Sequence, residues 1–421
     1  RDFFHWLHDE TSEQFSQELR FTSETSENGE WMIGLYYQNT ETANTMNIGR
    51  YFVAEWGAGA GIGNSNLALI RPMEIDDTTI SVFATRTFFL SDKLHLTAGV
   101  RHTDVEKDYI RTTAALGING TGYVYDGFDS LKYTHKGSLA DGTLQENSYS
   151  ETATTPSLML QYFQDENSML YASYSDGFKA GGYEALGTAL PNNGRYYSEG
   201  VDAFEIGYKT SADNMKVSVN YFHSEYDGNQ LSQFIYPADG APYNTTANVP
   251  STNEGIEVEL SYLLSDTVIA DLSFTHLDAT YDNYSGGTCA IGITPVAGSN
   301  SCDYTGLPLL YAPDTSGLFS LTSDNELSNG VMMRSSISVY FTDDVWHNTD
   351  YDVNSFEEGY SKIDARIEFS KDDWKVAILG KNLTDEYTSN WNQQTNWTFQ
   401  TGQFSILDRT RSVAIQFSKD F

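Results

Sequence analysis

The chain has 421 residues, 24 basic against 58 acidic side chains and a formal net charge of -34. A chain this acidic has no basic patch to neutralise phosphates, so a nucleic-acid partner is excluded. No run of about 18 apolar residues occurs, which excludes a transmembrane helix. Aromatic residues make up 14% of the sequence, and this composition favours many half-buried strands over one thick core.

Apolar and polar residues alternate with a period of two along much of the chain, as expected for strands with one apolar face. We count about fifteen such segments of roughly 9 to 15 residues, longer than a usual strand. In chain order the clearest apolar sets are Trp31, Ile33, Leu35 and Tyr37; Leu94, Leu96, Ala98 and Val100; Phe204, Ile206 and Tyr208; Val217, Val219 and Tyr221; Ile256, Val258, Leu260 and Tyr262; Val268, Ala270, Leu272 and Phe274; Ile363, Ala365, Ile367 and Phe369; and Val413, Ile415, Phe417 and Phe421.

The connections between these segments alternate in length. Short polar turns are predicted at Ser91, Asp165, Ser211, Ser265 and Ser370. Long connections rich in Gly, Asn, Thr and Tyr are predicted over 41–77, 108–150, 180–198, 281–307, 343–358 and 386–403. Short turns at one end and long loops at the other are typical of an up-and-down antiparallel sheet.

Charged residues occupy the polar face in the middle of several strands, including Glu257, Glu259, Arg334, Arg366 and Glu368. A soluble sandwich would turn that face to bulk water, whereas a membrane barrel turns it to a wet interior and places the apolar face against lipid. The strand lengths match the hydrocarbon thickness, and aromatic residues gather near strand ends. We therefore predict a transmembrane antiparallel β-barrel, with these five residues on its lumen wall.

Cys289 and Cys302 bracket a loop rich in Gly, Ser and Pro. This arrangement predicts a disulfide formed outside a reducing cytoplasm, and two unpaired loop thiols are the alternative. We find no paired catalytic residues and no set of metal ligands with suitable spacing. Residues 57–66 mimic a phosphate-binding loop but lack the Lys that follows it. The sequence thus predicts no enzyme, no metal site and no cofactor.

Aromatic residues in the long loops are the candidate ligand-binding residues. Trp391, Trp397 and Phe399 lie among amide side chains, which suits a sugar or a hydrophobic chelate that stacks on rings. Tyr196 and Tyr197 follow Arg195, which can bind an anionic ligand. The alternative is that these rings only pack the loops together.

Several segments resemble the C-terminal barrel region of TonB-dependent outer-membrane receptors, and the resemblance covers nearly the whole chain from Phe15 onward. They are TTPSLMLQYFQDENSMLYASYSDGFKAGGYE (154–184), VDAFEIGYKT (201–210), STNEGIEVELSY (251–262), LLYAPDTSGLFSL (309–321), GKNLTDEYTSN (380–390) and the final RTRSVAIQFSKDF (409–421). The KNLTDEY segment followed by a last strand that ends in Phe is the most specific of them.

The resemblance implies a plugged barrel of 22 strands, of which about 15 are visible here. Residues 1–421 would form one β-barrel domain without the N-terminal plug and the first strands. Phe417 and Phe421 would belong to the strand that the outer-membrane assembly machinery recognises.

The resemblance further implies an import receptor in the outer membrane of a Gram-negative bacterium. Its loops would bind a scarce small ligand such as a ferric siderophore, and the TonB–ExbB–ExbD complex would supply energy through the plug. The barrel would contact outer-membrane lipid and lipopolysaccharide. A passive porin-like channel and a soluble extracellular glycan-binding β-sandwich or adhesin remain as alternatives.

Overall fold

The computed structural model describes residues 4–50, 67–117, 143–184, 194–235, 243–290, 292–299, 301–394 and 403–420. One antiparallel sheet of 15 strands dominates it, each strand paired with its neighbours in chain order. These strands are β1 (Phe4–Thr22), β2 (Gly29–Arg50), β3 (Leu67–Ser91), β4 (Leu94–Gly117), β5 (Thr143–Phe163), β6 (Ser168–Lys179), β9 (Glu199–Ala212), β10 (Met215–Ile235), β11 (Tyr243–Ser265), β12 (Val268–Tyr281), β13 (Thr315–Glu326), β14 (Met332–Thr342), β17 (Tyr360–Lys371), β18 (Trp374–Lys381) and β21 (Ser412–Lys419).

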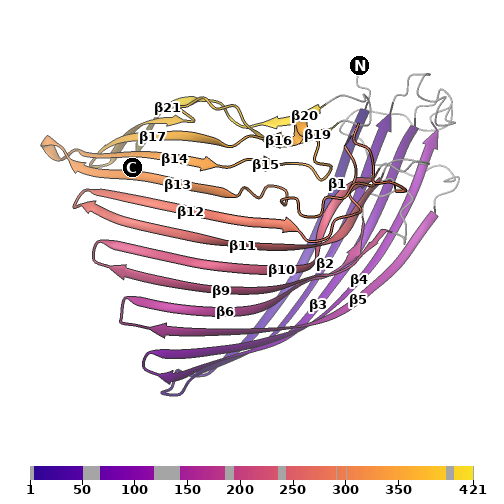
Figure 1. Cartoon of the computed structure of the whole chain (residues 1–421), viewed down its shortest axis with the longest axis horizontal. Helices are drawn as coiled ribbons and strands as arrows, with labels where there is room; N and C mark the ends of the chain where they lie inside the picture. The colour runs from indigo at the N-terminus through magenta and orange to yellow at the C-terminus, as the bar shows by residue number, and fades with distance from the viewer. Residues whose placement is uncertain are drawn as a thin grey trace.

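The sheet is a strongly curved wall, in which β1 to β5 turn away from the direction of the later strands (Figure 1). Within the described residues, β1 and β21 are its two edges. The predicted all-β, up-and-down architecture with about fifteen strands is confirmed. The described part of the chain holds no helix of the length and apolarity needed to span a membrane.

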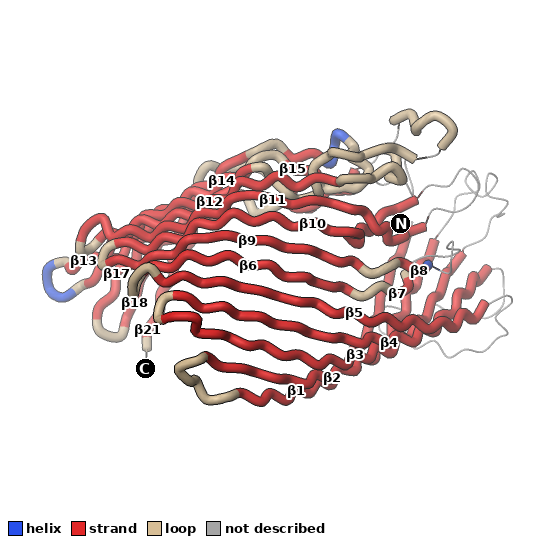
Figure 2. The backbone as a smooth tube through the Cα atoms, turned by 60° about the horizontal axis from the view of Figure 1, so that its bottom comes forward, coloured by secondary structure: helices blue, strands red, loops and turns tan. Residues whose placement is uncertain are grey.

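In the part of the chain that the structure describes, three small hairpins and one short 3-10 helix lie in the long connections, and a second 3-10 helix lies in the short turn between β13 and β14. The hairpins are β7 (Gly182–Tyr183) with β8 (Arg195–Tyr196), β15 (Val345–Trp346) with β16 (Phe356–Glu357), and β19 (Ser389–Gln394) with β20 (Gln403–Leu407). The helices are η2 (Ser328–Gly330) and η3 (Val353–Ser355). Figure 2 shows the short turns gathered at one end of the sheet and the long connections at the other.

Several strands continue far beyond the segments that the sequence predicts. β3 has 25 residues and β4 has 24, so the loops predicted over 41–77 and 108–150 are wrong in part. Pairing continues through Glu41 with Asp76 and through Asp108 with Ser148. The strict alternation of apolar and polar residues stops there, because residues 67–70 (LALI) are a continuous apolar run and residues 108–117 (DYIRTTAALG) carry apolar side chains on both faces, while the backbone ladder goes on.

The apolar face of the sheet is exposed along its length. Ile256 and Ile367 are 44% and 43% exposed, and Val217 is half-buried. A soluble sandwich would pack this face against a second sheet, but the described strands form one large sheet whose only companions are two-stranded. The arrangement contradicts the sandwich alternative.

Aromatic rings cover glycines on neighbouring strands. A Cβ atom added at Gly207 of β9 would lie 2.5 Å from the ring of Tyr171 on β6, its cross-strand partner. Gly34 and Phe83 form the same kind of pair between β2 and β3. A ring laid over a glycine fills the space that the missing side chain leaves, and such pairs help to fix the register of a sheet.

We predict that Gly207→Val lowers the free energy of unfolding by about 1–3 kcal/mol, because the new side chain displaces the Tyr171 ring. Gly286→Ala is the control, since nothing lies within 4 Å of a Cβ added there. The measurement is the urea midpoint of the protein in detergent. Equal urea midpoints for both variants would show that the packing of the Tyr171 ring over Gly207 does not contribute to stability.

Candidate functional site

The polar face of the sheet carries the charged residues that the sequence singles out, opposite the exposed apolar face. Glu257 accepts a hydrogen bond of 3.1 Å from Asn220, and Glu259 lies two residues further along the same face of β11. Arg366 pairs with Glu368 on β17, and Arg334 lies 3.7 Å from Asp324. The five predicted wall residues therefore share one face but are spread over several strands.

The connection between β6 and β9 folds onto this polar face near the long-loop end. The ring of Tyr183 in β7 stacks on Tyr109 of β4 with centroids 5.4 Å apart. The guanidinium of Arg195 lies 5.2 Å from the ring centroid of Tyr149 on β5 and 5.5 Å from that of Tyr197. Tyr109 and Tyr149 are buried, so the loop covers part of the wall.

Hydrogen bonds from β10 and β11 hold the return of this loop. The Asn248 amide donates to the carbonyl oxygens of Tyr197 and Ser198 at 2.9 and 3.1 Å and accepts from the backbone nitrogen of Tyr197. The Gln230 amide donates to the carbonyl oxygens of Ala180 and Tyr197, both at 3.0 Å. The position of Arg195, Tyr196 and Tyr197 is thus fixed from both sides.

Two adjoining clefts lie between the wall and this loop. Their volumes are about 300 and 350 Å³, and both are lined by Asp77 and Lys107. The Lys107 ammonium lies 3.3 Å from the Asp77 carboxylate. Threonine hydroxyls line the first cleft, and the second adds Tyr109, Tyr183 and Tyr196 with two glutamines.

The side chains that line the clefts can bind a small molecule through hydrogen bonds. Burial raises the pKa of Tyr196, with Glu184 and Asp77 adding to the rise, so its phenol remains a neutral hydrogen-bond donor at physiological pH. Within the described residues no group of three or more His, Cys, Asp or Glu could hold a metal ion. The volumes fall at the lower end of those of small-molecule sites.

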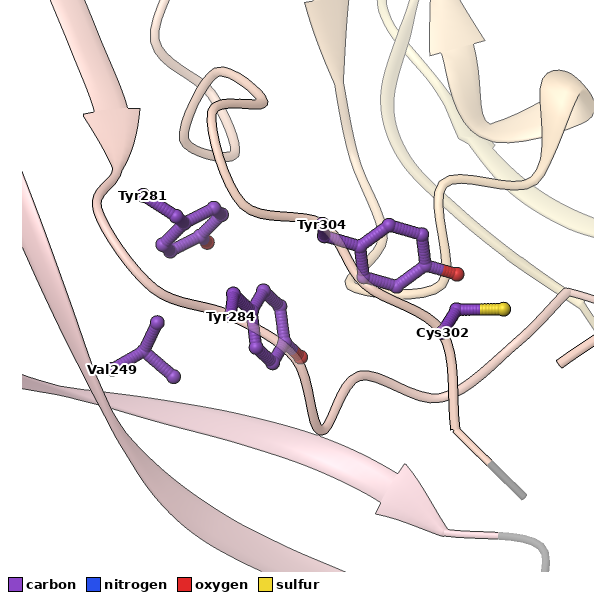
Figure 3. Close-up of a cluster of buried hydrophobic side chains, with 5 residues drawn as sticks. All are labelled: Val249, Tyr281, Tyr284, Cys302 and Tyr304. Atoms are coloured by element: carbon purple, nitrogen blue, oxygen red, sulfur yellow. The ribbon is translucent and has the colours of Figure 1, made fainter. Parts of the chain in front are cut away.

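A second covering of the polar face comes from the connection between β12 and β13. Figure 3 shows its buried cluster of Val249, Tyr281, Tyr284, Cys302 and Tyr304. The phenol of Tyr284 donates to the Gln233 side chain of β10 at 2.8 Å. The rings of Tyr284 and Tyr304 meet edge to face with centroids 5.6 Å apart.

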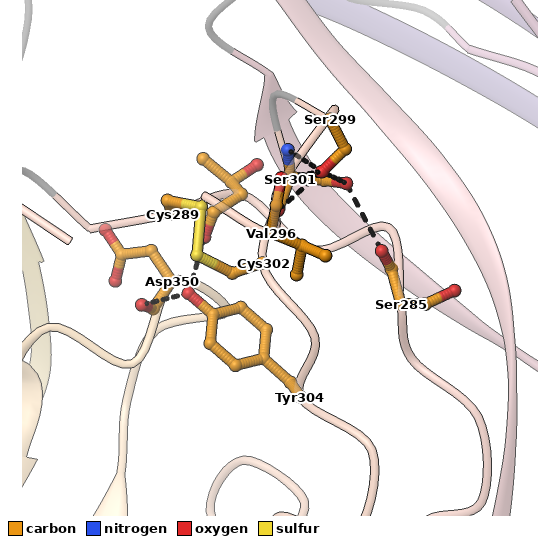
Figure 4. The surroundings of a disulfide bond; sticks show 9 residues. Ser285, Cys289, Val296, Ser299, Ser301, Cys302, Tyr304 and Asp350 are labelled. Atoms are coloured by element: carbon orange, nitrogen blue, oxygen red, sulfur yellow. Dashed lines mark hydrogen bonds between the residues drawn. A yellow bond between two sulfur atoms is a disulfide. The ribbon is translucent and has the colours of Figure 1, made fainter. Parts of the chain in front are cut away.

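A disulfide joins Cys289 to Cys302 within this connection, with an S–S distance of 2.05 Å. Figure 4 shows Tyr304 beside it, donating to the backbone oxygen of Asp350 at 2.7 Å. The phenol of Tyr351 donates to Pro308 at 2.6 Å. The connection between β14 and β17 is therefore tied to the one between β12 and β13.

The Asp350 carboxyl is buried at this junction. Burial raises its pKa from 3.8 to about 6, and the nearby Asp352 carboxylate adds to the rise. The backbone nitrogen of Asp352 donates to this carboxyl at 3.1 Å, which lowers the pKa in part. The packed junction therefore favours the protonated carboxyl.

Of the predicted binding residues that the structure describes, only Tyr196 lines a cleft, and Arg195 and Tyr197 flank it in sequence. Trp391 lies on β19, in the connection between β18 and β21. There the Asn392 amide contacts Ser389 at 2.8 Å and His347 Nδ1 at 3.2 Å. Trp397 and Phe399 lie outside the described residues, as does Phe421. Phe417 is 67% exposed on the apolar face of β21.

The sequence analysis missed Asp77, Lys107 and Tyr109, which line the clefts, and also Tyr149, whose ring contacts Arg195. They fall at the edges of, or within, the two stretches predicted as loops. A usable signal was present, because Arg101, Thr103, Val105, Lys107 and Tyr109 continue the alternate positions of β4 on one face.

A single antiparallel sheet with an exposed apolar face, short turns at one end and loops folded over the polar face at the other defines a transmembrane β-barrel fold with large loops. Residues 3–383 match the family described as TonB dependent receptor-like, beta-barrel. The chain belongs to this family, which comprises transport receptors. No curated protein matches the sequence.

Solved structures show the same fold at low sequence identity. The ferric yersiniabactin uptake receptor FyuA from Yersinia pestis is 14% identical with a TM-score of 0.76, and the match covers 100% of this chain and 56% of that one. The siderophore receptor PiuA from Acinetobacter baumannii is 12% identical with a TM-score of 0.61, and the match covers 98% of this chain and 65% of that one. The ferric-catecholate import receptor Fiu from E. coli K12 is 13% identical with a TM-score of 0.59, and the match covers 98% of this chain and 64% of that one. The chain spans less than two thirds of the length of each.

We predict that the junction around Asp350 becomes more stable as the pH falls. A carboxyl with a raised pKa in the folded state stabilises that state below pH 3.8 and loses this contribution as the pH rises through about 6. The full effect is about 3 kcal/mol. Limited proteolysis of residues 343–359 should be slower at pH 5 than at pH 8.

Asp350→Asn should make the junction resistant to proteolysis at both pH 5 and pH 8, because the amide is always neutral. Asp344→Asn, which changes an exposed carboxyl of the same connection, should keep the wild-type dependence. A proteolysis rate in wild-type protein that does not change between pH 5 and pH 8 would contradict the assignment.

Proposed function

We propose that this chain forms the wall and outer loops of an import receptor in the outer membrane of a Gram-negative bacterium. The observation that supports this most is the pair of clefts between the polar face and the inward-folded connection of β6 and β9, on a sheet whose opposite face is apolar and exposed. The clefts bind the ligand, and no covalent chemistry is involved.

Placement in a membrane follows from the exposed apolar face. Side chains such as Leu35, Ile206 and Ile256 are 44% to 49% exposed, and their contact with water would be unfavourable along the whole sheet. Contact with lipid removes this cost. In hydrocarbon, the backbone groups at the edges of a sheet need partners, which supports a closed barrel.

The proposed ligand is a ferric siderophore or a chelate of similar chemistry. Lys107 in the clefts and Arg195 next to Tyr196 offer positive charge to an anionic chelate, while the rings of Tyr183 and Tyr196 in the second cleft offer stacking surfaces. Solved relatives in fold are named as receptors for ferric yersiniabactin and ferric catecholates. These names support the ligand class without selecting a member of it.

Energy for release is proposed to come from the TonB–ExbB–ExbD complex through a plug packed against the polar face. The residues proposed to line that contact are Glu257, Glu259, Arg334, Arg366 and Glu368. The exposed Phe417 on β21 is proposed to serve recognition by the assembly machinery. Trp391 remains a proposed contact for ligands approaching the loop between β18 and β21.

We predict that Arg195→Ala weakens binding of an anionic ferric siderophore about tenfold, as expected for the loss of one charge-assisted contact. The measurement is binding and uptake of radioactive iron carried by ferric yersiniabactin and by a ferric catecholate. Arg411→Ala is the matched control, because Arg411 pairs with Asp385 in another loop. Unchanged binding of every transported chelate would remove Arg195 from the site.

We also predict that an arginine is harmful at one position of β10 and tolerated at the next. Val219→Arg should lower the stability of the assembled barrel by about 2–4 kcal/mol, because it places a charge in hydrocarbon. Asn220→Arg places the same charge on the polar face and should be tolerated. Heat-modifiable migration in gels reports assembly, and equal yields of both folded variants would argue against a lipid-facing Val219.

A further inference from the structure

A groove interrupts the apolar face near the short-turn end of β2, β3 and β4. It has a volume of about 330 Å³ and is lined by Trp31, Ile33, Ala84, Ala98 and Val100 together with Arg86 and neighbouring backbone. Across the strands, Trp31 pairs with Arg86 and Arg86 with Ala98, while Ile33 pairs with Ala84 and Ala84 with Val100. The two alanines form the floor because the residues around them are larger.

Arg86 is a charged residue on this lipid-facing side, and the apolar Phe88 and Leu90 follow it on the same face. Its guanidinium lies 5.1 Å from the ring centroid of Phe88. The long side chain therefore extends toward the short turn at residues 92–93, as a cation does when it reaches for the membrane surface.

No described residue forms an ion pair with Arg86. The pairs formed elsewhere, such as Lys107 with Asp77 and Lys381 with Asp364, lie on the polar face. A guanidinium left without a counter-ion at the margin of hydrocarbon is unfavourable. An anion supplied by the surroundings would remove that cost, and a phosphate fits the planar donors of Arg best.

We propose that this groove binds one anionic phospholipid from the leaflet at the short-turn end. Its acyl chain lies over Ala84 and Ala98 between Trp31 and Val100, and its phosphate accepts hydrogen bonds from Arg86. The proposal rests on the membrane placement argued under the proposed function. It assigns a lipid site to a face of the barrel that takes no part in ligand import.

The groove and the charge select the occupant together. A groove lined almost wholly by carbon suits an alkyl chain, and a single cation at its end near the turn suits a single phosphate at the depth of the headgroups. A free anion would gain nothing from Trp31, Ile33 or Val100. A neutral lipid would leave Arg86 without a counter-ion.

The test is native mass spectrometry of the complete natural polypeptide, purified in mild detergent and incubated with dioleoylphosphatidylglycerol or dioleoylphosphatidylcholine. The wild-type protein should retain one phosphatidylglycerol molecule in preference to phosphatidylcholine. Arg86→Gln should lower this retention at least about tenfold, and Arg86→Lys should restore part of it.

Two further variants separate the groove from the charge. Ala84→Leu with Ala98→Leu fills the floor and should abolish retention while Arg86 stays in place. Ala270→Leu adds the bulk of one leucine to the apolar face of β12, and Lys371→Gln removes a cation beside another short turn, so both should retain the lipid as wild type does. If Arg86→Gln fails to assemble, the groove-filling pair decides.

Retention that is equal in wild type, Arg86→Gln and the groove-filling pair would overturn the proposal, as would a wild-type protein that retains no phosphatidylglycerol. Failure of the proposed function has a different signature. A chain that folds and stays soluble without detergent contradicts the membrane placement and the lipid site together, whereas a detergent-dependent protein without bound lipid contradicts the lipid site alone.

Discussion

One sheet separates two solvents, and the remaining features of the molecule follow from this constraint. Because alternate residues of a strand point to opposite faces, a period of two in the sequence becomes an apolar surface on one side and a polar surface on the other. Ile256 and Glu257 are neighbours in sequence, yet they face different media. A core of the usual kind is not needed for such a sheet, and the buried clusters of the described residues occur where loops cover the polar face.

The loops obtain their order from the part of the wall that extends past the apolar band. Tyr109 and Tyr149 belong to these extensions, and both are buried only because the connection of β6 and β9 folds over them. The disulfide and the tyrosines around Tyr304 do the same for the connection of β12 and β13. The binding surfaces are thus built from loops that the rigid sheet holds in place.

The sequence predicts this fold well wherever the two solvents impose their pattern. The strands β10, β11 and β17 show clean alternation, so their faces could be assigned without coordinates, and Cys289 with Cys302 could be paired from their shared loop. The extensions of β3 and β4 were harder to predict, since the strict alternation ends at Asp77 and Asp108 and apolar residues then occur on both faces. The alternate positions of β4 from Arg101 to Tyr109 carried the usable signal. The contact of Arg195 with Tyr149 could not be predicted from the sequence, because it depends on how a long connection returns across the sheet.

Site-directed spin labelling of β10 tests the central claim most directly. Single cysteines at residues 217 to 222, each carrying a nitroxide, would be compared in reconstituted membranes for collision with oxygen, which concentrates in lipid, and with a water-soluble nickel chelate. The account predicts alternation with a period of two, oxygen contact being highest at 217, 219 and 221 and nickel contact at 218, 220 and 222. Uniform access of the nickel chelate to all six positions would contradict it.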